Sequence, residues 1–320
     1  PVKGVTMEIL TDVTRVIDLS FLGRPHVIAT AVVETPAGIV LVDPGPSTCL
    51  DRLHQELAAE GIVSRDLHAL LLTHIHLDHA GASGSLVRIH PHLRVYVHER
   101  GAPHLVDPAK LLASAARLYG ADMDRLWGES ASVPSDRITR LAGGECLSFG
   151  SSEFDVAYTP GHASHHVSFR HRQTGIAFVG DTAGIRIGSE AYVLPPTPPP
   201  DIAFDGWRQS LAVIRDWDPA GLFVTHFGLK PDVDTHLASL EQELDYWQIS
   251  SGQLVAAGLD DAAQARRFIE NVSRRIAERA GTERSADYLA AVPLEHCWMG
   301  LARYWRKRVS SAPRTGVPIA

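Results

Sequence analysis

The sequence predicts a mixed α/β fold in which two halves of strands and helices are followed by a helical tail. Strand-like runs rich in branched apolar residues occupy residues 27–43 and return over residues 138–181. Several of these runs end at a histidine or an aspartate. After His226 strand signals almost vanish, and apolar residues recur at helical spacing, as in Leu237 and Leu240.

The first half is expected to alternate between strands and helices. Pro36-Ala37-Gly38 lies between two β-rich runs and is a hairpin signal. Gly61 follows an amphipathic stretch and is expected to end a helix. We therefore predict strands over 27–33, 38–43, 67–72 and 94–98, and helices over 49–60 and 80–89.

Strands are expected to return after a helical insertion. Residues 103–135 read as helical, with breaks at Pro103, Pro108 and Pro134, and we expect them to cover one edge of the site. Beyond this insertion we predict strands over 146–149, 154–158, 167–170, 176–179 and 222–225, and a helix over 204–216.

The chain length favours one large domain with an appendage. The 320 residues are 45% hydrophobic, which is ample for a packed core. We assign residues 1–232 to the main domain, with its helical insertion over 103–135. Residues 233–320, hereafter the tail, are expected to form about three helices that cover the site.

Charge and cysteine usage argue against several classes of partner and compartment. The formal charge of −7 argues against nucleic acid as a partner. No apolar run approaches the roughly 20 residues that span a bilayer, and Pro1 to Gly4 lack a signal-peptide pattern. The three cysteines are far apart, which fits a reducing cytoplasm. A small-molecule substrate is the expected partner, and a homodimer stays open.

Four potential metal ligands lie within one short segment. The chain holds 17 histidines, and Thr73-His74-Ile75-His76-Leu77-Asp78-His79 directly follows an apolar strand. Neutral imidazoles and carboxylates are ligands for divalent metals such as zinc. One tetrahedral ion cannot take all four together with further donors, so the segment favours two neighbouring ions.

Three further strand ends carry the same residue types. His162 follows Thr159-Pro160-Gly161, Asp181 follows Val179-Gly180, and His226 follows Val224-Thr225. A lone histidine at any of these places would usually be structural. Because ligands grafted on loops at one edge of a rigid sheet build such sites, the four strand ends together predict a metal centre.

This ordered pattern resembles the metallo-β-lactamase superfamily, and within it the glyoxalase-II-like branch. The matching pattern, His-x-His-x-Asp-His followed by His, Asp and His, runs from His74 to His226, and the resemblance covers residues 27–226. The resemblance implies a four-layer αββα sandwich with two divalent metal ions at one edge. Zinc is preferred, and iron and manganese suit the same ligands.

The resemblance also implies a role for each ligand. Asp181 would bridge the two ions, and Asp43, in Leu41-Val42-Asp43, would orient a ligand histidine. Metal one would take His74, His76 and His162, and metal two would take Asp78, His79 and His226. A hydroxide that bridges the metals would attack an acyl or phosphoryl centre, with Asp78 orienting it and moving a proton.

The substrate is less well defined by the sequence. Asp181 argues against a dedicated β-lactamase, because β-lactamases of this fold lack the bridging aspartate. Tyr192 has the spacing at which glyoxalase II places a substrate-binding tyrosine, yet Glu190 stands where that enzyme carries lysine. Homoserine-lactone hydrolases place a tyrosine where this chain has Gly184.

Three other features are candidates for substrate contact. His166 could bind a substrate oxygen, or it could lie in a supporting or surface position. Arg186 could replace the missing lysine, and a solvated arginine is the alternative. The cations of the tail, Arg303, Arg306, Lys307 and Arg308, stand among aromatic residues, although a solvated basic helix face is the more common explanation.

Taken together, the residues predict a dinuclear metal-dependent hydrolase of a small ester, thioester or lactone. The alternatives are an iron-dependent oxidoreductase that resembles persulfide dioxygenases, a lactonase acting on homoserine lactones, and a binding protein that has lost turnover. The retention of every ligand argues against the last of these.

Overall fold

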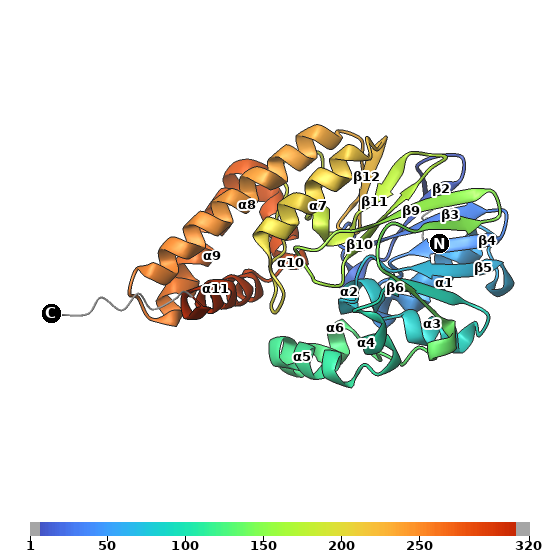
Figure 1. The fold of residues 1–320 in the computed structure, drawn as a ribbon, viewed down its shortest axis with the longest axis horizontal. Helices are drawn as coiled ribbons and strands as arrows, with labels where there is room; N and C mark the ends of the chain where they lie inside the picture. The colour runs from blue at the N-terminus through green and yellow to red at the C-terminus, as the bar shows by residue number, and fades with distance from the viewer. Residues whose placement is uncertain (1–6, 312–320) are drawn as a thin grey trace.

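A computed structural model describes residues 7–311, without the side chains of residues 309–311 (Figure 1). Two β-sheets lie face to face, with helices on their outer sides. The last nine residues of the predicted tail, and the segment Pro1 to Gly4, lie outside the described residues.

The first sheet contains seven strands in chain order. Its first four strands are antiparallel, and from β4 onward neighbouring strands are parallel. The strands are β1 (Glu8–Ile9), β2 (Thr14–Asp18), β3 (Ala29–Thr35), β4 (Gly38–Val42), β5 (Leu67–Leu71), β6 (Arg94–His98) and β7 (Ile138–Leu141). Parallel pairing of β4 with β5 brings the carboxyl ends of both strands to one edge of the sheet.

The second sheet contains six strands in the order β13-β12-β11-β10-β9-β8. Neighbours β11 and β12 run parallel, so these two strands also end at the same edge. The strands are β8 (Cys146–Phe149), β9 (Ser152–Tyr158), β10 (Val167–His171), β11 (Ile176–Phe178), β12 (Gly221–Val224) and β13 (Gly228–Lys230).

Successive side chains of a strand point to opposite faces of the sheet and pack into different cores. In β4, Val40 and Val42 face the core between the two sheets, which also holds Phe169 of β10. Leu41 points the other way, into the core beneath the outer helices. The predicted four-layer αββα sandwich is therefore confirmed.

The helices of the main domain cover the outer faces of the sheets. A 13-residue helix, α7 (Phe204–Asp216), buries Trp207, Leu211 and Ile214 against the second sheet. The others are α1 (Leu50–Ala59), α2 (Leu77–Ala80), α3 (Ser83–Ile89), α4 (Ala102–Val106), α5 (Ala109–Tyr119) and α6 (Met123–Leu126). Figure 1 shows α4, α5 and α6, from the segment 102–126, beside the sandwich.

The tail consists of four helices in the described part of the chain, one more than the sequence suggested. They are α8 (Val233–Ala256), α9 (Asp261–Ala280), α10 (Thr282–Ala291) and α11 (Leu294–Ser311). They project beyond one end of the sandwich (Figure 1). Their apolar faces share one core with α7 and the second sheet, through residues such as Leu240 and Trp247.

Two sequence predictions differ from the structure in detail. The helix expected over 80–89 is divided into α2 and α3. Pro103 does not break a helix but lies in the first turn of α4, where a missing backbone N–H costs nothing. Strands over 94–98 and 146–149 and the helix over 204–216 match their predicted bounds.

Candidate metal centre

Seven histidine and aspartate side chains meet where strands of both sheets end. The segment after β5 supplies four of them, and the segments after β9, β11 and β12 supply one each. We refer to them as the histidine–aspartate cluster: His74, His76, Asp78, His79, His162, Asp181 and His226. Parallel neighbours β4 and β5, and β11 and β12, place these ends at one edge.

The cluster divides into two groups of converging ligand atoms. One atom from each member of a group lies within 4.8 Å of the others. The first group holds His74, His76, His162 and Asp181, and the second holds Asp78, His79 and His226. In the first group, His76 Nδ1 lies 3.0 Å from His74 Nε2 and 3.0 Å from His162 Nε2.

Asp181 faces both groups with different oxygens. Its Oδ2 lies 3.5 Å from His162 Nε2 in the first group. Its Oδ1 lies 3.3 Å from His79 Nε2 and 3.7 Å from His226 Nε2 in the second group. A carboxylate in this position can bridge two cations, one in each group.

Hydrogen bonds on the far side of the rings aim the histidines into the cluster. His162 Nδ1 lies 2.9 Å from the Pro196 carbonyl oxygen, and His226 Nδ1 lies 2.6 Å from that of Val27. In both rings the Nδ1–H can donate to the carbonyl, which leaves Nε2 without a proton and free to bind a metal.

Asp43 organises the segment that follows β5. Its carboxylate accepts hydrogen bonds from the Thr73 backbone N–H at 2.8 Å and from the hydroxyls of Thr73 and Thr225 at 2.7 Å and 2.9 Å. It also lies 2.8 Å from His79 Nδ1. Asp43 thus ties the two sheets together and orients one histidine of the cluster, which is the place expected for it.

The glycine before Asp181 is required by close packing. Gly180 has a φ of +43°, and a Cβ there would lie 2.4 Å from Thr73 Oγ1 and 2.8 Å from His166 Nε2. Only glycine fits this backbone beside those side chains. The sequence Val179-Gly180-Asp181 therefore places the aspartate at the junction of the two groups.

The imidazole pKa values differ between the two ligand groups of the cluster. Burial lowers the pKa of His76 to about 4, and burial with neighbouring imidazoles lowers that of His74 well below its usual value. Burial opposes ionisation of Asp78, yet His79 and His226 lower its pKa to about 2. For His79, the carboxylates outweigh burial and raise the pKa well above its usual value.

Two buried atoms of the cluster lie 3.3 Å apart and form no regular hydrogen bond. His79 Nε2 and Asp181 Oδ1 are buried and lack a hydrogen-bond partner within the described chain. Buried polar groups without partners are uncommon in folded proteins, and these two are among several such atoms in the described residues. With a set of only imidazoles and carboxylates, the residues fit a pair of divalent cations.

Comparison with known proteins agrees with this geometry. The sequence model of the metallo-beta-lactamase superfamily matches residues 23–226, more than half of the chain. The chain belongs to this superfamily. Members of the metallo-beta-lactamase superfamily are mostly metal-dependent hydrolases, although other enzyme types occur, and they typically bind two divalent metals.

Curated relatives of the superfamily include glyoxalase-II-like proteins. A metallo-beta-lactamase fold-containing protein of Sulfurisphaera tokodaii is 29% identical over 166 residues, which is 51% of this chain and 61% of the relative. A hydroxyacylglutathione hydrolase of Legionella pneumophila is 29% identical over 153 residues, 47% of this chain and 45% of the enzyme. The chain thus matches about half the length of these relatives, and the predicted family resemblance is confirmed.

A solved structure extends the likeness in fold over most of the chain. A metallo-beta-lactamase family protein of Thermus thermophilus superposes with a TM-score of 0.65 at 20% identity. The superposition covers 88% of this chain and 89% of the other. At this identity the match shows the fold alone.

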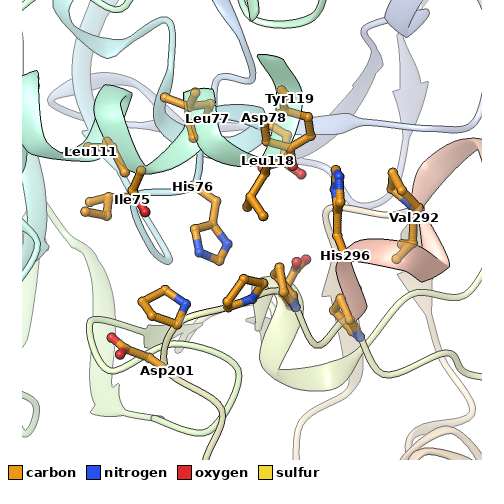
Figure 2. Close-up of a pocket in the computed structure, with 18 of the residues that line it drawn as sticks. Ile75, His76, Leu77, Asp78, Leu111, Leu118, Tyr119, Asp201, Val292 and His296 are labelled. Atoms are coloured by element: carbon orange, nitrogen blue, oxygen red, sulfur yellow. The ribbon is translucent and has the colours of Figure 1, made fainter. Parts of the chain in front are cut away.

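A cavity of about 260 Å³ lies against the histidine–aspartate cluster (Figure 2). Its lining includes His76, Asp78, Asp181 and His226 of the cluster. The insertion and the tail both contribute to its walls, the former through residues of α5 and the latter through residues 291–297. Such a volume lies slightly below the usual range for ligand sites, which is about 300–1,000 Å³, and favours a small ligand.

Two predicted substrate residues lie away from this cavity. His166 is fully buried behind His74, with its Nδ1 3.0 Å from Thr159 Oγ1 and its Nε2 accepting from the Thr182 backbone N–H. Tyr192 is 1% exposed, and its ring packs against Tyr288. Neither side chain lines the cavity, so the structure does not bring them to the predicted contact with a substrate.

The cationic candidates are also directed elsewhere. Arg186 is 4% exposed and is held by Asp232 at 2.8 Å and by the Glu190 carbonyl at 2.7 Å. Arg303 and Arg306 border a separate surface groove on α11. The sequence could not reveal these positions, because the orientation of side chains in a loop or at a helix end depends on tertiary packing.

The structure brings other side chains to the cavity that were not predicted. They include Tyr119 from α5, His165 and His296. A turn at residues 164–165 directs His165, rather than its neighbour His166, toward the cavity. The expectation that the insertion and the tail wall the site was the only sequence signal for Tyr119 and His296.

Proposed function

We propose that the chain is a dinuclear metal-dependent hydrolase of small acyl substrates, namely esters, thioesters or lactones. The observation that carries the proposal is the position of Asp181. Its two oxygens face the two ligand groups of the histidine–aspartate cluster, beside a cavity large enough for a small substrate. Zinc is the preferred metal, with iron and manganese as alternatives, because these ligands suit all three.

The chain's own residues would prepare the reaction in three ways. Metals bound to the cluster would supply an activated water and polarise the substrate carbonyl. Asp43 and the carbonyls of Pro196 and Val27 would keep the histidine rings oriented. Asp78, whose carboxylate is partly exposed and lines the cavity, would orient the attacking water and carry a proton to the leaving group.

The walls of the cavity favour neutral or weakly anionic acyl groups. Among the described residues, Lys110 is the only lysine or arginine in the lining, and it is accompanied by the carboxylate of Asp201. Glu190 stands at the position where glyoxalase II carries lysine. The guanidinium of Arg186 already donates a hydrogen bond to the Asp232 carboxylate. The two carboxylates of a glutathione thioester would therefore find few cationic partners here.

A substrate panel tests this proposal. We expect the metal-loaded protein to hydrolyse thioesters, lactones or aryl esters, and to act on an acyl-glutathione at least about tenfold less efficiently than on the same acyl group carried by N-acetylcysteamine, since a missing charge partner costs roughly 1.4 kcal/mol or more. Values of kcat/KM for the two thioesters give the comparison.

Three outcomes would contradict the proposal. A strong preference for the glutathione thioester would refute the argument from Glu190 and Arg186. Hydrolysis of phosphodiesters alone would exclude an acyl substrate. Oxygen uptake with a persulfide by the iron-loaded protein, without hydrolysis, would favour the persulfide dioxygenase-like alternative.

The compartment is part of the proposal. All three cysteines are free, with Cys49 and Cys297 buried and Cys146 exposed. Free thiols are typical of proteins that work in a reducing compartment such as the cytoplasm. In residues 7–311, no helix combines the length and apolar character that crossing a membrane requires.

A further inference from the structure

Tyr119 stands on the cavity wall at the place where the insertion and the tail meet. Its ring makes edge contacts with two aromatic neighbours, Trp127 at 5.0 Å and His296 at 4.9 Å between ring centroids. The interplanar angles are 77° and 87°. Because Trp127 belongs to the insertion and His296 to α11, the two contacts tie the ring to both segments. Figure 2 shows Tyr119 and His296 on the cavity wall.

The Tyr119 hydroxyl makes no hydrogen bond that stabilises the fold. It takes part in no hydrogen bond among the described residues, and the side chain is only partly buried. The side chain lines the same cavity as Asp78 and Asp181. A hydroxyl in the cavity wall that makes no hydrogen bond within the protein is suited to donate one to a ligand.

The surroundings of Tyr119 are apolar. Leu111 and Leu118 of α5 line one side of the cavity, and Val292 of the tail lines another (Figure 2). Ile75 and Leu77 extend this surface beside the cluster. An aliphatic chain would lose its contact with water here without leaving buried charges unpaired.

We propose that Tyr119 is a substrate-binding catalytic residue, whose hydroxyl donates a hydrogen bond to the acyl oxygen of a substrate with an aliphatic acyl chain. This inference rests on the proposed hydrolase function and defines its substrate class. The acyl oxygen lies next to Asp78 and Asp181, and the aliphatic chain lies along Leu111, Leu118 and Val292. The same donor holds one oxygen of the carboxylate product before release.

Binding of the product type provides a test that does not depend on turnover. The probe is octanoate, titrated calorimetrically into the metal-loaded native protein and into two variants. Tyr119→Phe keeps both ring contacts and removes only the hydroxyl. Tyr192→Phe is the matched control, because that hydroxyl is also without a partner but is buried outside the cavity.

We expect octanoate to bind the native protein and Tyr192→Phe equally, and Tyr119→Phe about 3- to 10-fold more weakly, as the loss of one neutral hydrogen bond predicts. The value of kcat/KM for an octanoyl thioester should fall in parallel, with unchanged melting temperatures. Equal octanoate affinity in Tyr119→Phe, or no octanoate binding by the native protein, would overturn the inference. If the native protein binds octanoate through Tyr119 yet hydrolyses no acyl substrate, only the proposed function fails.

Discussion

Replacing Asp181 by alanine is expected to abolish most hydrolysis and to prevent the protein from retaining two metal ions. Each oxygen of this carboxylate faces a different ligand group, at 3.5 Å from His162 Nε2 and 3.3 Å from His79 Nε2. Its loss leaves three imidazoles in the first group and removes the side chain that faces both. We expect the hydrolysis rate to fall by at least about 100-fold, the scale seen when one preorganised electrostatic group is removed.

The matched control for this variant is Asp201→Ala. Asp201 also carries a carboxylate in the cavity wall, but it accepts a hydrogen bond from the Ser164 hydroxyl at 2.6 Å and lies outside the cluster. Metal content measured after dialysis should be native in Asp201→Ala and reduced in Asp181→Ala. Native metal content and a native rate in Asp181→Ala would show that this residue does not bridge the groups.

Replacing Trp247 by alanine is expected to cost about 3–5 kcal/mol of unfolding free energy, the usual range for truncating a buried tryptophan. Trp247 lies on α8, is fully buried, and packs edge-on against Phe268 of α9 at 5.2 Å. The same core contains Leu211 of α7 and Val224 of β12. The tail is therefore an integral part of the fold, and the tail residues in the cavity wall depend on it.

Ile249→Ala is the control on the same helix. Ile249 is 61% exposed, so its truncation should change the unfolding free energy by less than about 0.5 kcal/mol. Urea denaturation of both variants gives the comparison. A similar, small effect of the two substitutions would mean that the tail does not share the core of the sandwich.

The histidine–aspartate cluster could be predicted from the sequence because most of its residues lie in short motifs directly after strands. His74, His76, Asp78 and His79 lie within six positions directly after a strand, and His162 also follows a strand end. The chemistry of such ligands and their place at strand ends require no knowledge of distant packing. The αββα layers followed from the same strands together with the family resemblance.

The cavity wall could not be predicted in the same way. Tyr192 has a spacing typical of a substrate-binding tyrosine, yet the helices of the tail enclose it against Tyr288. Tyr119 lies in the helical insertion with no motif around it, and its position in the wall depends on contact with His296, far along the chain. Contacts between segments so distant in sequence arise from tertiary packing, which spacing alone does not encode.

The central claim is that the histidine–aspartate cluster binds two metal ions, and elemental analysis of the purified protein tests it most directly. The two ligand groups joined by Asp181 predict two divalent ions per chain after equilibration with zinc and removal of the excess. A content of one ion per chain, unchanged when further zinc, iron or manganese is supplied, would contradict the account.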